Sequence, residues 1–213
     1  MMTESKPSTK GDRTRKQLLN AAVERFGRSG LQATSVADIS RDVSIARSAP
    51  YVYFESKDDL FYQALDHDAA GAIAGCLSVV FGERQTGDWT AELFETFVRT
   101  IDNHPLARRV LGGFEPAVTA RVLQTPAIEN LRAAVIDRLH SDQIAGLIRS
   151  DIAVDEVGGA LVTIILALLM AIIQLGPESV DAIRPDHLSA LVRAALHPPA
   201  SPDPADKPAA RVR

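Results

Sequence analysis

Residues 44–61, with the sequence SIARSAPYVYFESKDDLF, combine cationic side chains with aromatic rings. Arg47 and Lys57 stand on either side of Tyr51, Tyr53 and Phe54. A guanidinium forms paired hydrogen bonds with a phosphate or with the edge of guanine, and an ammonium attracts phosphate as a point charge. These residue types suit the binding of a polyanion.

The charge of the chain is divided in a way that agrees with this reading. The 213 residues carry a formal net charge of −4, but residues 1–60 hold 10 basic and 8 acidic residues. Residues 61–213 hold 13 basic and 19 acidic residues, so the N-terminal part is positive and the remainder is negative. Since net charge governs the approach of charged partners, a polyanion would approach the N-terminal end.

No residue pattern predicts catalysis, a cofactor or a metal ion. The five histidines are scattered, and the sequence holds no cysteine cluster at ligand spacing. The stretches GRSG and LGG lack the strand context of a phosphate-binding loop, and no nucleophile elbow is present. The single cysteine, Cys76, cannot form an internal disulfide, and no secretion signal precedes the first predicted helix. We expect a cytoplasmic protein without enzymatic activity.

Helical periodicity runs along almost the whole chain, and no segment shows the alternation typical of a half-buried strand. The sequence therefore predicts an all-α fold. We expect the first helices over residues 14–29, 36–43, 47–53 and 56–81, with Thr14, Ser35 and Ser56 at helix starts. Two short helices joined by a turn and braced by a longer helix form a helix-turn-helix, whose second short helix enters the major groove of DNA.

Two stretches carry a family pattern at this point: LLNAAVERFGRSGLQATSVADIS and ARSAPYVYFESKDDLF. Together they cover roughly Leu18 to Phe61, and this segment resembles the tetracycline-repressor (TetR) family of bacterial transcription regulators. The resemblance implies a one-component regulator, most often a repressor, that binds palindromic double-stranded operator DNA as a homodimer. It also implies a small-molecule effector that binds the C-terminal helical domain and releases the DNA.

The resemblance also assigns residues to the DNA. Ser35 and Lys57 would contact backbone phosphates, Tyr51 and Tyr53 would donate to phosphate oxygens, and the start of the third helix would face base edges. Two arginines before this segment would add phosphate or minor-groove contacts, or would simply form a solvated face. The expected DNA-binding residues are Arg13, Arg15, Ser35, Arg47, Ser48, Ala49, Tyr51, Tyr53 and Lys57.

Three positions depart from the family pattern. Ser44 replaces the usual glycine of the turn, Ser48 replaces a small residue that is often glycine, and Pro50 replaces an apolar residue. If Ala46 caps the third helix, Pro50 lies in its interior, where a proline costs roughly 3 kcal/mol. If Ser48 or Ala49 is the cap, Pro50 falls in the tolerant first turn. A damaged third helix would leave a DNA-organising or protein-interaction module that needs no ligand.

The predicted domain plan has four parts. Residues 1–10 form a disordered arm, residues 11–61 the DNA-binding domain, residues 62–196 the helical ligand-binding and dimerisation domain, and residues 197–213 a disordered proline-rich tail. The apolar run at 157–175 approaches the length of a bilayer span but lacks flanking basic residues, so we expect a core and interface helix and no membrane. By resemblance, the last two helices form the homodimer interface.

Few charges lie inside the C-terminal helices, which favours an apolar or weakly polar effector. Large apolar side chains of these helices are candidate walls of its pocket, although such residues more often belong to a core. The candidates are Trp89, Phe94, Phe97, Phe114, Leu123, Leu168 and Met170.

Overall fold

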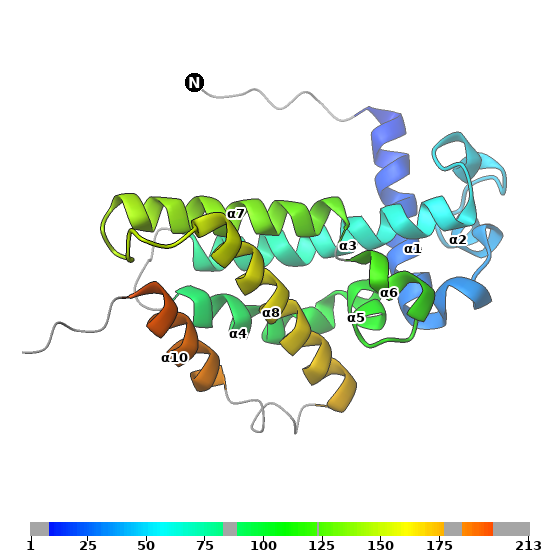
Figure 1. Ribbon diagram of the computed structural model, residues 1–213. Helices are drawn as coiled ribbons and strands as arrows, with labels where there is room; N and C mark the ends of the chain where they lie inside the picture. Colours follow the sequence, from blue (N-terminus) through cyan, green and yellow to red (C-terminus); the bar gives the residue numbers. More distant parts are fainter. Residues whose placement is uncertain (1–8, 83–88, 123, 177–184, 198–213) are drawn as a thin grey trace, which may run out of the picture.

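The computed structural model describes residues 9–82, 89–122, 124–176 and 185–197 (Figure 1). These residues form α-helices and two short 3₁₀ helices, without a strand, so the all-α prediction is confirmed. The elements in chain order are α1 (Lys10–Ala33), α2 (Val36–Asp42), η1 (Ala49–Val52), α3 (Lys57–Val80), α4 (Trp89–Thr100), η2 (Ile101–Asn103), α5 (Pro105–Leu111), α6 (Pro116–Val122), α7 (Pro126–Ile144), α8 (Val154–Leu175) and α10 (Pro185–Leu196). Residues 1–8 of the predicted arm at 1–10 and residues 198–213 of the predicted tail at 197–213 lie outside the described residues. Thr9 and Lys10 of that arm belong to the start of α1.

The first helix begins earlier than its sequence signals suggested. Thr9 is the N-cap: its hydroxyl accepts from the Asp12 N–H, and the Asp12 carboxylate accepts from the Thr9 N–H. This capping box outcompetes the predicted start at Thr14, which lies inside the helix and donates its hydroxyl to the Lys10 carbonyl. The prediction of Thr14 as the cap was therefore wrong.

The helices α2 and α3 begin where the sequence predicts. The Ser35 hydroxyl accepts from the Asp38 N–H at the start of α2, and the Ser56 hydroxyl accepts from the Asp59 N–H at the start of α3. Both serines have extended backbone angles, which is the usual geometry of an N-cap. The local sequence thus determines where α2 and α3 begin.

The central element of the molecule is α3. It packs against α1 near its start and against α4 and α7 along the rest of its length, as Figure 1 shows. The predicted domain boundary at residues 61 and 62 falls inside this helix. The Phe61 ring meets Phe26 of α1 edge-on at a centroid distance of 5.0 Å, so the apolar core runs without interruption from the N-terminal helices into the larger helical part.

Two carboxylates of α3 hold the starts of other helices. Asp66 accepts from the Ala127 N–H at the start of α7, at 2.8 Å. Asp68, which is 6% exposed, accepts from the Leu106 and Ala107 N–H groups at the start of α5, at 3.0 and 2.9 Å. A negative group at a helix start satisfies free N–H groups and complements the helix dipole. α3 therefore fixes where α5 and α7 begin.

Within the described residues, α8 is the helix long and apolar enough to cross a bilayer, and 39% of its most apolar window is buried. Leu161, Ile165 and Leu169 are buried in the core. The opposite side of the same helix leaves Ile164 and Ala167 exposed. One face of α8 is thus a core face, and the other is an apolar surface of the single chain.

Candidate nucleic-acid interface

The turn after α2 has the geometry expected where the family pattern has glycine. The Ser44 N–H donates to the Arg41 carbonyl and the Ile45 N–H donates to the Ser40 carbonyl, both at 3.1 Å, which are the two bonds of a Schellman motif. Ser44 adopts a φ of 55°, and it is the one non-glycine residue with positive φ among those described. The turn therefore keeps its shape although serine stands where glycine is favoured.

The element after this turn is a four-residue 3₁₀ helix, η1, and not the α-helix predicted for residues 47–53. Ser48 is its N-cap, so Pro50 falls in the first turn. This is the alternative in which the proline is tolerated. Pro50 is buried, and its carbonyl accepts from the N–H groups of Tyr53 and Phe54, both at 2.9 Å. Because a first-turn residue needs no intrahelical partner for its nitrogen, the proline breaks no hydrogen bond.

The 3₁₀ geometry sorts the side chains of this segment into three faces. Such a helix has about three residues per turn, so side chains three positions apart point the same way. The three pairs that share a face are Ser48 with Tyr51, Ala49 with Val52, and Pro50 with Tyr53. Pro50 is buried and Tyr53 is half-buried, which makes theirs the inner face. Tyr51 and Val52 are 59% and 79% exposed and point outward.

A surface hollow of about 430 Å³ lies between the start of α2 and η1. Its lining residues are Ser35, Val36, Ala37, Arg47, Ser48 and Tyr51. Four of them, the two serines with Arg47 and Tyr51, were assigned to DNA from the sequence. The structure therefore brings hydroxyl groups from two elements and one guanidinium into a single concave surface at the positive end of the chain.

An ion pair at the start of α2 offsets the negative charge of a carboxylate beside this hollow. The Ser35 hydroxyl donates to Asp38 at 2.6 Å, and Arg41 donates to the same carboxylate at 2.9 Å. The Ser35 bond and then the Arg41 bond hold the pKa of Asp38 below its usual value. Asp38 is therefore ionised and paired with Arg41.

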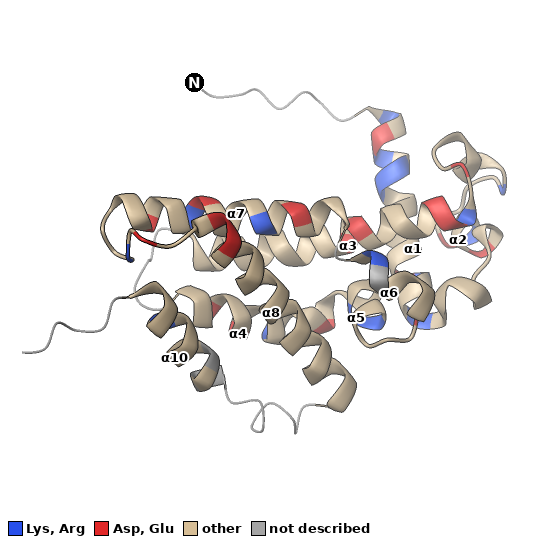
Figure 2. Ribbon diagram, viewed as in Figure 1, with Lys and Arg blue, Asp and Glu red and all other residues tan. Residues whose placement is uncertain are grey.

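The other residues assigned to DNA lie apart from the hollow. Arg13 is exposed on the first turns of α1, where the ribbon of Figure 2 is largely coloured for Lys and Arg. Arg15 donates to Gln63 of α3 and stands 5.6 Å from the centre of the Phe54 ring, so it braces α1 against α3. The Tyr53 hydroxyl lies beside Gly11 in the first turn of α1. It is 3.8 Å from the position that a Cβ atom on Gly11 would occupy.

Lys57 has a structural partner that the sequence did not indicate. Its Nζ donates to the Leu31 carbonyl at the end of α1, at 2.9 Å. The Leu31 N–H donates to Glu115, at 3.2 Å, and this carboxylate also accepts from Arg109 Nε at 2.9 Å. Leu31 thus joins the start of α3 to the segment between α5 and α6. These contacts span 26 and 84 residues of sequence, which is why no local pattern predicted them.

The backbone at this junction requires glycine. Gly30 has φ 79° and ψ 171°, a region that residues with a Cβ essentially do not occupy. A Cβ at this position would also stand 2.5 Å from a Glu115 carboxylate oxygen and 2.7 Å from the Arg109 guanidinium. The glycine predicted as the stop of the first helix therefore also lets Glu115 and Arg109 reach α1.

α2 is held to α1 by a paired ion bridge. Arg25 donates Nε and Nη2 to the two carboxylate oxygens of Asp42, at 2.9 and 2.5 Å. The Arg25 hydrogen bond lowers the pKa of Asp42. The sequence did not indicate this role of Arg25, because its partner lies on the next helix.

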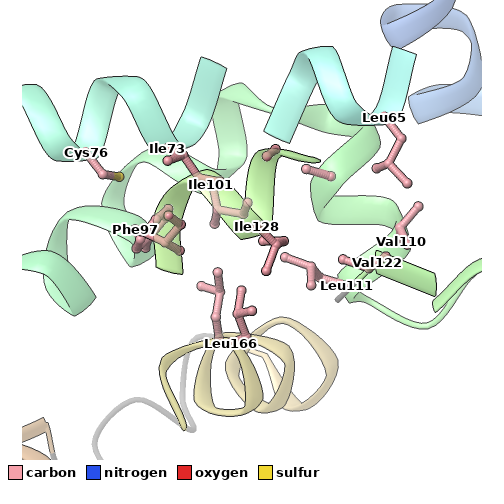
Figure 3. Close-up of a cluster of buried hydrophobic side chains, with 14 of the residues drawn as sticks. Leu65, Ile73, Cys76, Phe97, Ile101, Val110, Leu111, Val122, Ile128 and Leu166 are labelled. Atoms are coloured by element: carbon pink, nitrogen blue, oxygen red, sulfur yellow. The ribbon is translucent and has the colours of Figure 1, made fainter. Parts of the chain in front are cut away.

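An apolar cavity of about 40 Å³ lies in the larger helical part (Figure 3). Side chains of α3, η2, α5, α7 and α8 point into it, among them Leu65, Ile101, Val110, Ile128 and Leu166. The hydroxyl of its one polar lining residue, Thr125, already donates to the Val122 carbonyl at 2.9 Å. The cavity wall therefore offers a bound molecule hydrocarbon contacts.

The candidate pocket residues are spread over several environments. Phe97 lines the apolar cavity, whereas Phe94 is fully packed in the core and Trp89 lines a separate hollow beside α10. Phe114 is 64% exposed and lies against the Arg109 guanidinium. The remaining candidates on α8, Leu168 and Met170, are half-buried against the core, and Leu123 lies outside the described residues.

Comparison with known proteins relates the N-terminal helices to a family of regulators. The model of bacterial regulatory proteins of the tetR family matches residues 18–64, which hold most of α1, all of α2 and η1, and the start of α3. The N-terminal segment of this chain is therefore a TetR-family DNA-binding domain. TetR-family regulators are non-enzymatic DNA-binding transcription factors, which agrees with the prediction that the protein is not an enzyme.

One relative and two solved structures extend the comparison. The transcriptional regulator AcrR of Shigella flexneri is 24% identical over 98 residues, which are 46% of this chain and 45% of AcrR. The chain thus matches less than half the length of that relative. A TetR-family regulator from Mesorhizobium loti has a TM-score of 0.70 and 16% identity, covering 89% of this chain and 99% of that one. FadR of Bacillus subtilis, solved with stearoyl-CoA, has a TM-score of 0.66 and 13% identity, covering 85% and 99%. At these identities the two structures show a common fold.

Proposed function

We propose that this TetR-family protein acts in the cytoplasm as a homodimeric repressor that binds palindromic operator DNA and leaves it when an apolar effector enters the larger helical domain. The observation that carries the proposal is the hollow that joins Ser35, Arg47, Ser48 and Tyr51 beside η1. Hydroxyl groups and a guanidinium on one concave surface suit a phosphate backbone and a guanine edge together.

The contacts divide by chemistry. Arg47 is the base-reading residue, since a guanidinium bonds to both guanine acceptors in the major groove, with Ala49 and Ser48 allowing close approach. Tyr51 donates to a phosphate oxygen, and Ser35 does so once its hydroxyl turns away from Asp38, to which it donates in the free protein. Lys57 reinforces the same backbone with the donors that its bond to the Leu31 carbonyl leaves over.

An operator selection tests the DNA part of this proposal. Purified protein is incubated with random duplexes, and the affinity for the enriched sequence is compared with that for a scrambled duplex at several salt concentrations. Arg47→Ala should lose about 1–3 kcal/mol of this preference, because the base contact is removed while the phosphate contacts stay. The matched control is Arg132→Ala on α7, whose partner is Glu129 of the same helix. An unchanged preference in Arg47→Ala would refute its base-reading role.

The second copy is expected on the outer face of α8 and on α10. Ile164, Ala167 and Leu175 of α8 and Leu191 of α10 are exposed apolar residues. Two DNA-binding domains are needed because the two half-sites of a palindrome lie about 34–36 Å apart along the duplex. Ala167→Glu should give a monomer in gel filtration and weaken operator binding, whereas Ala133→Glu on the exposed side of α7 should do neither. A dimeric Ala167→Glu variant would place the interface elsewhere.

The effector part rests on the apolar cavity. Its volume of about 40 Å³ is well below the roughly 300–1,000 Å³ of usual ligand sites, so an effector larger than a few atoms must move the lining helices apart. FadR, which shares the fold, was solved with a ligand that carries a long acyl chain, and this supports a hydrocarbon effector.

The helices that line the cavity also reach the DNA-binding helices. Ala107 and Val110 of α5 line it, and Arg109 of the same helix binds Glu115, which accepts from Leu31 of α1. Residues in the middle of α3 also line the cavity. At the start of α3, Lys57 donates to the Leu31 carbonyl. Movement of either helix therefore acts on the end of α1, and an effector that favours the moved state lowers DNA affinity.

A simple amphiphile tests this mechanism. We expect 1-decanol to lower operator affinity by about 10-fold, within the usual range of coupling between sites, while glycerol has no effect. Ala69→Leu fills space at the cavity wall and should reduce the response, whereas Ala74→Leu, at an exposed position of the same helix, should keep it. Equal responses in both variants would exclude the cavity as the effector site.

A further inference from the structure

Val52 is an exposed apolar residue at the end of η1 to which the sequence reading gave no role. Its side chain is 79% exposed, although the neighbouring residues Pro50 and Phe54 are buried. We infer that Val52 contacts thymine methyl groups in the operator and so sets part of its sequence specificity. This inference rests on the proposed function, since it requires η1 to enter the major groove.

The position of Val52 follows from the 3₁₀ geometry. Pro50 is locked into the core, and side chains three positions apart share a face, so Val52 is turned away from the core and shares its face with Ala49. The neighbouring face, with Ser48 and Tyr51, borders the hollow that holds Arg47. Val52 and Ala49 therefore form a small apolar face beside the polar, phosphate-binding one.

The chemistry of the duplex identifies the group that this face can read. The edges of the four base pairs in the major groove present hydrogen-bond donors and acceptors, and the thymine 5-methyl is the apolar group among them. A valine has two methyl groups and one strongly preferred rotamer in a helix, so it loses little freedom when it makes such a contact. An aromatic ring at this position would instead favour stacking or phosphate contact.

A duplex that lacks single methyl groups provides the test. Each thymine of the selected operator is replaced in turn by deoxyuridine, which removes the 5-methyl and leaves every hydrogen-bonding group in place. We expect one symmetry-related pair of positions at which binding weakens about 4-fold per half-site, which corresponds to the about 0.8 kcal/mol of one buried carbon group. Substitution of both half-sites should weaken binding about 15-fold.

The variant Val52→Ala tests whether Val52 makes the contact with the thymine methyl group. The variant should bind the thymine operator about as weakly as the wild type binds the deoxyuridine operator, and it should no longer distinguish the two duplexes. Val79→Ala, at a position of α3 that is 53% exposed, is the control and should keep the full thymine preference. Circular dichroism checks that both variants fold.

The outcomes separate this inference from the function on which it rests. If Val52→Ala selects the same operator and keeps the thymine preference at every position, the assignment of Val52 is wrong while DNA reading stands. If the wild type prefers no duplex over random DNA, the proposed function itself fails. If deoxyuridine has no effect at any position, the operator is read without methyl contacts and the inference is overturned.

Discussion

Ser44 shows how one residue can keep a turn at some cost in stability. Its φ of 55° lies in the left-handed region, which costs a residue with a Cβ roughly 1–2 kcal/mol relative to glycine. The turn persists because the two Schellman bonds, the packing of α2 against α1 and the packing of η1 against α2 hold it. The connection between the two short helices is thus shaped by its surroundings as well as by its own sequence.

We predict that Ser44→Gly raises the free energy of unfolding by about 1 kcal/mol, part of the strain relief being offset by the greater freedom of glycine in the unfolded chain. Urea denaturation followed by circular dichroism measures the change. Ser48→Gly is the matched control: Ser48 has an ordinary φ of −87°, so glycine there should lower stability. A loss of stability in Ser44→Gly would mean that the serine side chain contributes more than its backbone costs.

At the scale of elements, α2 depends on its bridge to α1. The Arg25 guanidinium lowers the pKa of Asp42 in the folded protein, so the bridge stabilises the fold at pH values above the unfolded pKa of about 3.9. This contribution is lost as the pH falls through the lower, folded pKa. The attachment of α2, and with it the position of the turn and η1, should therefore weaken in acid.

Asp42→Asn tests this dependence. The variant should be less stable than the wild type at pH 7, and the difference in unfolding free energy should shrink as the pH is lowered from about 5 towards 2, where the wild-type carboxylate is protonated as well. Chemical denaturation at a series of pH values gives both curves. Asp137→Asn, at an exposed position of α7, should show no comparable convergence. Parallel curves for Asp42→Asn would show that its ion bridge contributes nothing in solution.

Element prediction succeeded where the signal is local and failed where two local signals competed. Ser35 and Ser56 mark helix starts by capping, and α2 and α3 begin directly after them. Thr9 and Thr14 both suit a cap, and the complete capping box at Thr9 prevailed. Pro50 permitted two registers, and its burial in the core selects the one in which η1 is a short 3₁₀ helix.

At the scale of the whole molecule, the junction at Leu31 links the N-terminal helices to the larger helical part. Glu115 is 9% exposed and accepts from both Arg109 and the Leu31 N–H. Removal of this carboxylate leaves a largely buried guanidinium and a buried N–H without their partner, which is more costly than the loss of a surface pair. The junction therefore contributes to stability as well as to the proposed coupling.

We predict that Glu115→Ala lowers the free energy of unfolding by about 2–3 kcal/mol. Glu129→Ala removes the exposed partner of Arg132 on α7 and should cost less than about 1 kcal/mol. Thermal and urea denaturation measure both. Glu115→Gln, which keeps one acceptor oxygen, should fall between the two. Equal stability of Glu115→Ala and the wild type would rule out a structural role of the junction.

The sequence by itself determined the all-α class, the starts of α2 and α3 and the resemblance to the TetR family, because caps, periodicity and short motifs act over a few residues. The tertiary structure decided the 3₁₀ form of η1, the outward direction of Val52, the partner of Lys57 and the composition of the apolar cavity. These features depend on contacts between residues far apart in the chain, where the free energy of packing and of buried hydrogen bonds chooses among local options that are nearly equal.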